Sequence, residues 1–244
     1  FSFILKFSFM RIEVWSDIAC PFCYLGLAKL NQAIQNLGLE SEVQIELHTF
    51  LLNPGLKTDL SESITNYLQK HRQIPLDRIT EMNQQIALQG NQFGLEFQMD
   101  KIVVANTIKA HLLLHEAHEQ GLQMPMKLRL LKAYFTEGQN IDDIEVLKTL
   151  AQEVGLKSDH LDLAILGGKH SRSFTQELQE AQDLQRSHRL LRRAPHPSRL
   201  GVWRFRTRSR QTPLELGRED HCRLSPHHRR QSRPDPSPPR RHPL

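Results

Sequence analysis

The sequence contains only three cysteines among its 244 residues, and no apolar run approaches the roughly 18 residues of a membrane-spanning helix. Three cysteines are too few for the disulfide framework of a small secreted domain. The apolar run of residues 1–9 has no basic segment before it and no small-residue cleavage site after it, unlike a secretory leader. These absences predict a cytoplasmic protein without a membrane partner. We place its natural start at Met10 and regard residues 1–9 as an upstream extension.

The last quarter of the chain lacks the residues that build a core. Residues 186–244 contain no Lys, Ile, Met or Tyr, and Val202 is their only valine. They carry 16 Arg, 4 acidic residues and 9 of the 13 prolines, whereas residues 1–185 carry 16 basic and 23 acidic residues. The net charges are +12 and −7. Too little apolar surface remains in residues 186–244 to offset the entropy cost of ordering, so we expect a largely disordered tail.

Residues 10–58 show the pattern of a strand, a helix and a second strand. Ile12 and Val14 alternate with polar residues, as in a short strand. Apolar residues then recur at helical spacing as far as Gly38, a good C-cap, and alternation returns until about Phe50. This order predicts a right-handed βαβ unit.

The pattern over residues 61–185 is helical throughout. It predicts an α-helical insertion domain over residues 59–170 and a helix over residues 171–185 that returns to the first domain. Asp142 and Glu145 have capping-box spacing at the start of one helix. The expected helices cover about residues 64–71, 76–93, 105–121, 125–134, 144–154, 161–165 and 174–184.

The segment Cys20-Pro21-Phe22-Cys23 lies between the first strand and the first helix. A helix N-terminus carries partial positive charge, which favours a thiolate over a thiol. We therefore predict a redox dithiol in which Cys20 is the nucleophile and Cys23 resolves the mixed disulfide. Pro21 and Phe22 complete the motif and shape the bend. Half of a zinc site and a pair of inert thiols are the alternatives, although no second cysteine pair supplies the remaining ligands.

Two groups of side chains near this motif allow a functional and a structural interpretation. Trp15, Phe22 and Tyr24 would form an apolar surface for unfolded substrates, or simply part of the core. The remaining group recurs at helical spacing and is expected on a partly solvated helix face. It consists of His111, His115 and His118.

The run from Val14 to Gly26, Val-Trp-Ser-Asp-Ile-Ala-Cys-Pro-Phe-Cys-Tyr-Leu-Gly, resembles the active-site segment of the DsbA-like thioredoxin superfamily, specifically its FrnE-type oxidoreductases. Residues 50–54, 106–111 and 133–141 resemble other parts of that family, and the resemblance covers about residues 11–184. It implies an α/β, thioredoxin-like fold with a large α-helical insertion. It also implies a disulfide oxidoreductase that acts on protein or peptide thiols and disulfides through Cys20.

The resemblance implies no metal and no tightly bound organic cofactor, although glutathione or a thioredoxin-like protein would supply electrons. A sister branch uses glutathione to isomerise 2-hydroxychromene-2-carboxylate and typically carries Ser at the position of Cys20. Two cysteines favour the disulfide branch, and the isomerase activity is the alternative.

The chain departs from this family after residue 185. The family continues with a Gly-Val-x-Gly-Val-Pro type segment and a Val-Ser-Gly-Ala type segment, and neither is present. Shifting the reading frame by one nucleotide allows Arg186-Ser187-His188-Arg189 to read Gly-Val-Thr-Gly. We therefore expect that residues 186–244 are out of frame, that the C-terminal strands are missing or replaced, and that this copy is impaired.

The Arg-rich tail also suggests a second class of function, which is nonspecific nucleic-acid binding through phosphate contacts. Only Trp203 and Phe205 are available in the tail to stack on bases, and no recognition motif is present. Specific nucleic-acid binding is therefore not expected.

Overall fold

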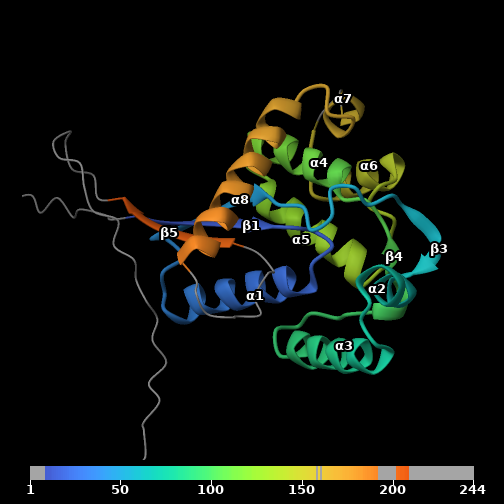
Figure 1. Cartoon of the computed structure of the whole chain (residues 1–244). Helices are drawn as coiled ribbons and strands as arrows, with labels where there is room; N and C mark the ends of the chain where they lie inside the picture. Colours follow the sequence, from blue (N-terminus) through green and yellow to red (C-terminus); the bar gives the residue numbers. More distant parts are fainter. Residues whose placement is uncertain (1–8, 158, 160, 192–201, 209–244) are drawn as a thin grey trace, which may run out of the picture. The chain divides into compact units, whose positions relative to one another are not determined.

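The computed structural model describes residues 9–157, 159, 161–191 and 202–208 (Figure 1). The strands are β1 (Phe9–Ser16), β2 (Val43–Thr49), β3 (Asp59–Ser63), β4 (Val103–Val104) and β5 (Val202–Arg208). The helices are α1 (Pro21–Asn36), α2 (Ile64–Arg72), α3 (Leu76–Asn91), α4 (Ile108–Glu119), α5 (Gln123–Phe135), α6 (Ile144–Glu153), α7 (Leu161–Ile165) and α8 (Ser171–Leu191), with a 3-10 turn at Met99–Lys101.

The larger sheet has the strand order β2-β1-β5. β1 and β2 are parallel, with Ile12 opposite Ile45 and Ser16 opposite Thr49. The helix α1 connects them, so the predicted βαβ unit is confirmed. Parallel strands end at the same edge of a sheet, and the carboxyl ends of β1 and β2 therefore lie side by side where α1 begins.

The two faces of β1 follow the alternation in its sequence. Ile12 and Val14 belong to the main core, to which α1 also contributes, as their shared spacing predicts. Trp15 points to the opposite face, where it joins a small cluster with Phe50 and Ala181 of α8. Figure 1 accordingly shows α1 and α8 on opposite sides of the sheet.

The helical insertion shares its core with the βαβ unit. Leu113, Leu130 and Leu150 are fully or almost fully buried in the same cluster as Ile12 and Val14. The prediction of a thioredoxin-like α/β fold with a helical insertion is therefore confirmed. Among the described residues, no helix is long and apolar enough to cross a membrane.

The sequence pattern predicted an insertion that is helical throughout, but the structure also contains two short strands there. β3 and β4 pair antiparallel, with Ser63 opposite Val103. Both strands are too short for alternation to stand out from the helical patterns beside them. α6 starts at the predicted residue, Ile144, but its capping residue is Asp143 and not Asp142, because the Asp143 side chain accepts from the N–H groups of Glu145 and Val146.

The prediction of a disordered or out-of-frame tail over residues 186–244 is wrong about order in two segments. α8 continues from Ser171 to Leu191, beyond the predicted end at residue 185. β5 pairs antiparallel with β1, so that Val14 lies opposite Trp203. The expected replacement of C-terminal strands therefore takes the form of a strand from the tail itself. The rest of the tail, with Pro195, Pro197 and Cys222, lies outside the described residues.

Candidate active site

The dithiol lies where α1 begins. Cys20 precedes the helix in an extended conformation, and Pro21 takes the first helical position, where its missing N–H costs no hydrogen bond. The carbonyl of Cys20 accepts from the N–H groups of Cys23 and Tyr24 at 3.0 and 3.3 Å. Neither Cys20 nor Cys23 forms a disulfide, and they are 0% and 5% exposed. A substrate therefore reaches the sulfur atoms only after a local movement.

The two thiols have different acidities. The hydrogen bond from the Cys23 thiol is the main influence on Cys20 and lowers the pKa of Cys20 despite its burial. The same hydrogen bond, together with burial, raises the pKa of Cys23 well above its ordinary value. The helix N-terminus adds attraction for a negative charge on Cys20. This arrangement favours one thiolate, on Cys20, and one thiol, on Cys23.

Asp17 is close enough to the dithiol to act electrostatically on both cysteines. The sequence analysis did not identify it as a site residue. Its carboxylate accepts from the N–H groups of Ile18 and Leu52, both at 2.7 Å. His111 Nε2 lies 3.3 Å from Asp17 Oδ1 and donates to it. Burial opposes ionisation of Asp17, but the hydrogen bonds from His111, Leu52 and Thr107 outweigh it, so the pKa of Asp17 lies below its ordinary value.

Lys127 of α5 is the second buried charge at this site. It is 1% exposed, and its Nζ donates to the carbonyl of Ser16 at 3.0 Å. Burial lowers the pKa of Lys127, while negative charge on Cys23, Asp17 and Cys20 opposes that shift. Lys127 is therefore close enough to respond electrostatically to the ionisation of the dithiol.

The sequence pattern predicted one partly solvated face for the three histidines of α4, and the structure does not show it. His111 is 1% exposed, and its burial lowers its pKa. His115 is half-buried and bonds Thr49 Oγ1 through Nε2 at 3.0 Å. Only His118 is exposed. A solvated face is therefore wrong for His111.

Glu177 of α8 forms a second carboxylate cluster. It accepts from the N–H of Thr49 at 2.7 Å and lies 3.1 Å from His48 Nδ1. His115 Nε2 is 3.3 Å away. Although burial opposes ionisation, the bonds to His115 and His48 hold the pKa of Glu177 far below its usual range. This cluster fastens α8 to β2 and α4.

Two groups of side chains in the described part of the chain have the spacing of metal ligands, and neither contains a cysteine. One is Glu13, Glu46 and His48, where the Arg11 guanidinium pairs with both glutamates. The other is Glu116, Glu119 and His170. There Lys169 Nζ lies 2.8 and 2.6 Å from the two carboxylates. A cationic side chain thus already pairs with both carboxylates of each group.

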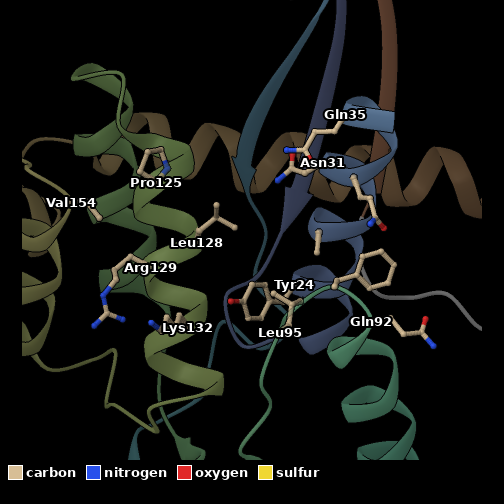
Figure 2. Close-up of a pocket in the computed structure, with 13 residues that line it drawn as sticks. Tyr24, Asn31, Gln35, Gln92, Leu95, Pro125, Leu128, Arg129, Lys132 and Val154 are labelled. Carbon is tan, nitrogen blue, oxygen red and sulfur yellow. The ribbon is translucent and has the colours of Figure 1, made fainter. Parts of the chain in front are cut away.

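The described part of the chain contains a cleft and a separate cavity. A cleft of about 680 Å³ runs between α1 and α5, and Tyr24 forms part of its wall (Figure 2). A cavity of about 570 Å³ adjoins the loop after β2, with Asn53, Lys57, Glu62 and Arg72 in its lining.

Trp15 stacks on His48, and their ring centroids are 4.3 Å apart. The core interpretation therefore holds for Trp15.

The buried charges had recognisable sequence signals. Lys127 shares a helical stripe with Leu130, Leu131 and Tyr134, so a lysine occupies a position where the pattern requires an apolar residue. Asp17 lies three residues before Cys20, inside the run from Val14 to Gly26 that resembles the family's active-site segment. A charged residue on a buried stripe is a candidate for a functional site.

The fold and the dithiol helix define a thioredoxin-like protein. A model of the DSBA-like thioredoxin domain matches residues 11–186, and the chain belongs to that family. The uncharacterized protein YwbO of Bacillus subtilis (strain 168) is 30% identical over 148 residues, which is 60% of this chain and 67% of that protein.

Solved structures share the fold. A probable DsbA oxidoreductase from Streptomyces coelicolor superposes with a TM-score of 0.67 and 25% identity, covering 72% of this chain and 76% of that one. A 2-hydroxychromene-2-carboxylate isomerase gives a TM-score of 0.52 at 12% identity, covering 70% and 78%. The fold alone therefore does not separate the two activities.

Proposed function

We propose that the protein is a thiol–disulfide oxidoreductase that uses Cys20 as the nucleophile and Cys23 as the resolving thiol. The observation that carries this proposal is the pair of cysteines at the start of α1, which form no disulfide, with the pKa of Cys20 lowered and that of Cys23 raised. A nucleophile must ionise before its partner, and the hydrogen bond between the two sulfur atoms favours that order.

The reaction proceeds in two exchanges. The Cys20 thiolate attacks one sulfur of a substrate disulfide, so that the substrate S–S bond breaks and its other sulfur leaves as a thiolate that takes up a proton. Cys23 then loses its proton and attacks the Cys20 sulfur, which releases the second substrate thiol. The substrate disulfide gains two electrons, and the Cys20–Cys23 dithiol is oxidised to a disulfide. The reverse sequence oxidises a substrate dithiol.

The second exchange requires a thiolate on the buried Cys23, and Lys127 supports its formation. Positive charge on Lys127 lowers the pKa of Cys23, opposing the effect of burial. Asp17 balances that charge when no thiolate is present. Lys127 thus places a positive charge near the Cys23 thiolate as it forms, while the Asp17 carboxylate acts in the opposite direction.

The dithiol must be regenerated by a thiol of the cell, and glutathione or a thioredoxin-like protein would serve. The cavity beside the β2 loop carries the cations Lys57 and Arg72 together with the carboxylates of Asp59 and Glu62. This mixture suits a small zwitterionic thiol such as glutathione. The cytoplasm, where thiols are kept reduced, is the compartment we propose.

The isomerase activity is the less favoured alternative, because it uses glutathione as its thiol and leaves the Cys20–Cys23 pair without a role. Nucleic-acid binding through the tail has no support among the described residues. A DsbA-like exchange on protein or peptide thiols accounts for both cysteines.

The test measures reduction of insulin and of glutathione disulfide by the full chain, with Cys20→Ser and Cys23→Ser as variants. Cys20→Ser should abolish both reactions. Cys23→Ser should still attack and should accumulate a mixed disulfide visible by mass spectrometry. Turnover that survives Cys20→Ser would remove the proposal, and isomerisation of 2-hydroxychromene-2-carboxylate by the same sample would favour the alternative.

A further inference from the structure

The α1–α5 cleft has the proportions of a peptide site. Its α1 wall is formed by Tyr24, Ala28, Asn31 and Gln35, with Gln32 beside them. These positions recur along one face of the helix for three turns, a length of about 16 Å. An extended chain of about five residues has the same length. Figure 2 shows Tyr24, Asn31 and Gln35 of this wall across the cleft from Leu128 of α5.

The lining of the cleft is apolar and amide-rich, and it contains no carboxylate. Leu95, Leu128 and Val154 provide apolar contacts. The side-chain amides of Asn31, Gln32, Gln35 and Gln92 make no hydrogen bond to other described residues. Each amide offers a donor and an acceptor, as a peptide main chain requires of its partner.

Charge in the cleft has one sign. Arg129 and Lys132 of α5 are its two ionised residues. Glu137 and Glu153 pair with Arg129, but no ion pair of Lys132 occurs among the described residues. The cleft therefore favours a segment that is neutral or acidic and disfavours a basic one.

The walls are held in place without a ligand. Lys29 of α1 donates to Gln89 of α3 at 2.8 Å, and its Nζ lies 5.8 Å from the centre of the Phe93 ring. On the other side, the Arg129 pairs connect α5 to α6 and to the loop before it. A preformed cleft loses little entropy when it binds.

We propose that the α1–α5 cleft binds an extended, apolar and acidic segment of a substrate polypeptide. The inference rests on the proposed function, because Tyr24 at one end of the cleft directly follows Cys23. A segment lying along α1 brings its end to the turn that carries the dithiol.

Fluorescence anisotropy with an eight-residue peptide without cysteine tests this site. The peptide carries leucines and one glutamate, and its match carries lysine in place of the glutamate. Leu128→Asp should raise the dissociation constant of the glutamate peptide roughly tenfold, because a charge replaces an apolar contact. Leu163→Asp alters a leucine of α7 that is 58% exposed outside the cleft lining, and it should leave the dissociation constant unchanged.

A second variant keeps the test valid if Leu128→Asp unfolds. Gln35 is exposed, so its substitution should not disturb the fold. Gln35→Glu should weaken binding of the glutamate peptide severalfold and strengthen binding of the lysine peptide. Equal binding by wild type and Gln35→Glu overturns the proposal. Binding of these peptides does not involve the dithiol, so Cys20→Ser should bind like the wild type. Failure of glutathione disulfide turnover would then count against the proposed function alone.

Discussion

Two carboxylates of this protein bind histidines that lie one turn apart on α4, and they differ in what surrounds them. Asp17 binds His111, and Glu177 binds His115. Asp17 is buried, its main donors are backbone N–H groups, and Lys127 interacts with it electrostatically. Glu177 is half-buried and receives His48 as well as His115.

The comparison teaches that burial and neighbours, not residue type, decide the role of a His–carboxylate pair. Both carboxylates have a pKa below the ordinary value, so both are ionised at neutral pH. Asp17 acts electrostatically on both thiols, whereas Glu177 acts on Lys127 and His111 beside them. The Glu177 cluster fastens one helix to the sheet.

The largest expected effect is a difference in the stability lost when each carboxylate is replaced by alanine. Asp17→Ala leaves the N–H groups of Ile18 and Leu52 without their acceptor and removes a negative charge that acts on the buried Lys127, so the free energy of unfolding should fall by about 3–5 kcal/mol. The matched change Glu177→Ala should cost about 1–3 kcal/mol, because water reaches the freed groups. Urea denaturation measures both. Equal losses would show that the two clusters do not differ in burial as described.

Lys127→Met should separate the clusters by chemistry. It removes the charge that favours a thiolate on Cys23, so release of the second thiol from the mixed disulfide should slow by about tenfold, the equivalent of one pKa unit. Stopped-flow kinetics of that step measure the change. Lys101→Met, which alters an exposed lysine outside the α1–α5 cleft, is the control. An unchanged rate would remove Lys127 from the mechanism.

Glu177→Gln should sharpen the comparison through pH. The depressed pKa of Glu177 stabilises the fold above the unfolded carboxyl value of about 4.3, and this contribution falls progressively as pH decreases from that value to the much lower folded value. Wild type should therefore exceed the variant by about 1–2 kcal/mol at pH 7. The difference should shrink below about pH 4 in urea titrations, while disulfide exchange at pH 7 stays unchanged. Loss of exchange would connect this cluster to the dithiol.

The smallest effect belongs to the third histidine of α4. His118 is exposed, and His118→Ala should change the free energy of unfolding by no more than about 0.5 kcal/mol. His111→Ala, which opens a buried site next to Asp17, should cost several times as much. Thermal and urea unfolding of both variants would show whether exposure along one helix ranks these residues correctly.

Regular patterns made much of the fold predictable. Alternation located β1 and β2, and helical spacing located the helices that pack through long apolar stripes. Three features escaped because they depend on contacts distant in sequence. β3 and β4 are short and pair with each other. β5 forms by pairing with β1 in a segment of unfavourable composition. Asp142 does not cap α6, because Thr58 and Lys109 bind its carboxylate.

The cysteine motif and its position at a helix N-terminus were predictable, whereas the charges beneath it were not identified. Lys127 comes from a helix more than a hundred residues away, and only packing brings it to Ser16. The roles of Cys20, Cys23, Pro21 and Phe22, as well as the domain boundaries at residues 9, 58, 170 and 185, stay predictions.

The proposed frame shift has a direct test of its own. The family match ends at residue 186, where the composition of the chain changes. Translating the coding DNA of residues 180–205 in all three frames should restore Gly-Val-x-Gly and Val-Ser-Gly segments in one of them. If no frame restores them, β5 is the native edge strand and the Arg-rich end is genuine.

A sheet of three strands leaves two open edges. Within the described ranges, β1 is central, and the outer sides of β2 and β5 carry backbone groups that pair with no other strand. Such edges are templates for pairing with another chain. This protein should therefore self-associate through edge strands as its concentration rises, and a light-scattering profile would report that before any loss of secondary structure.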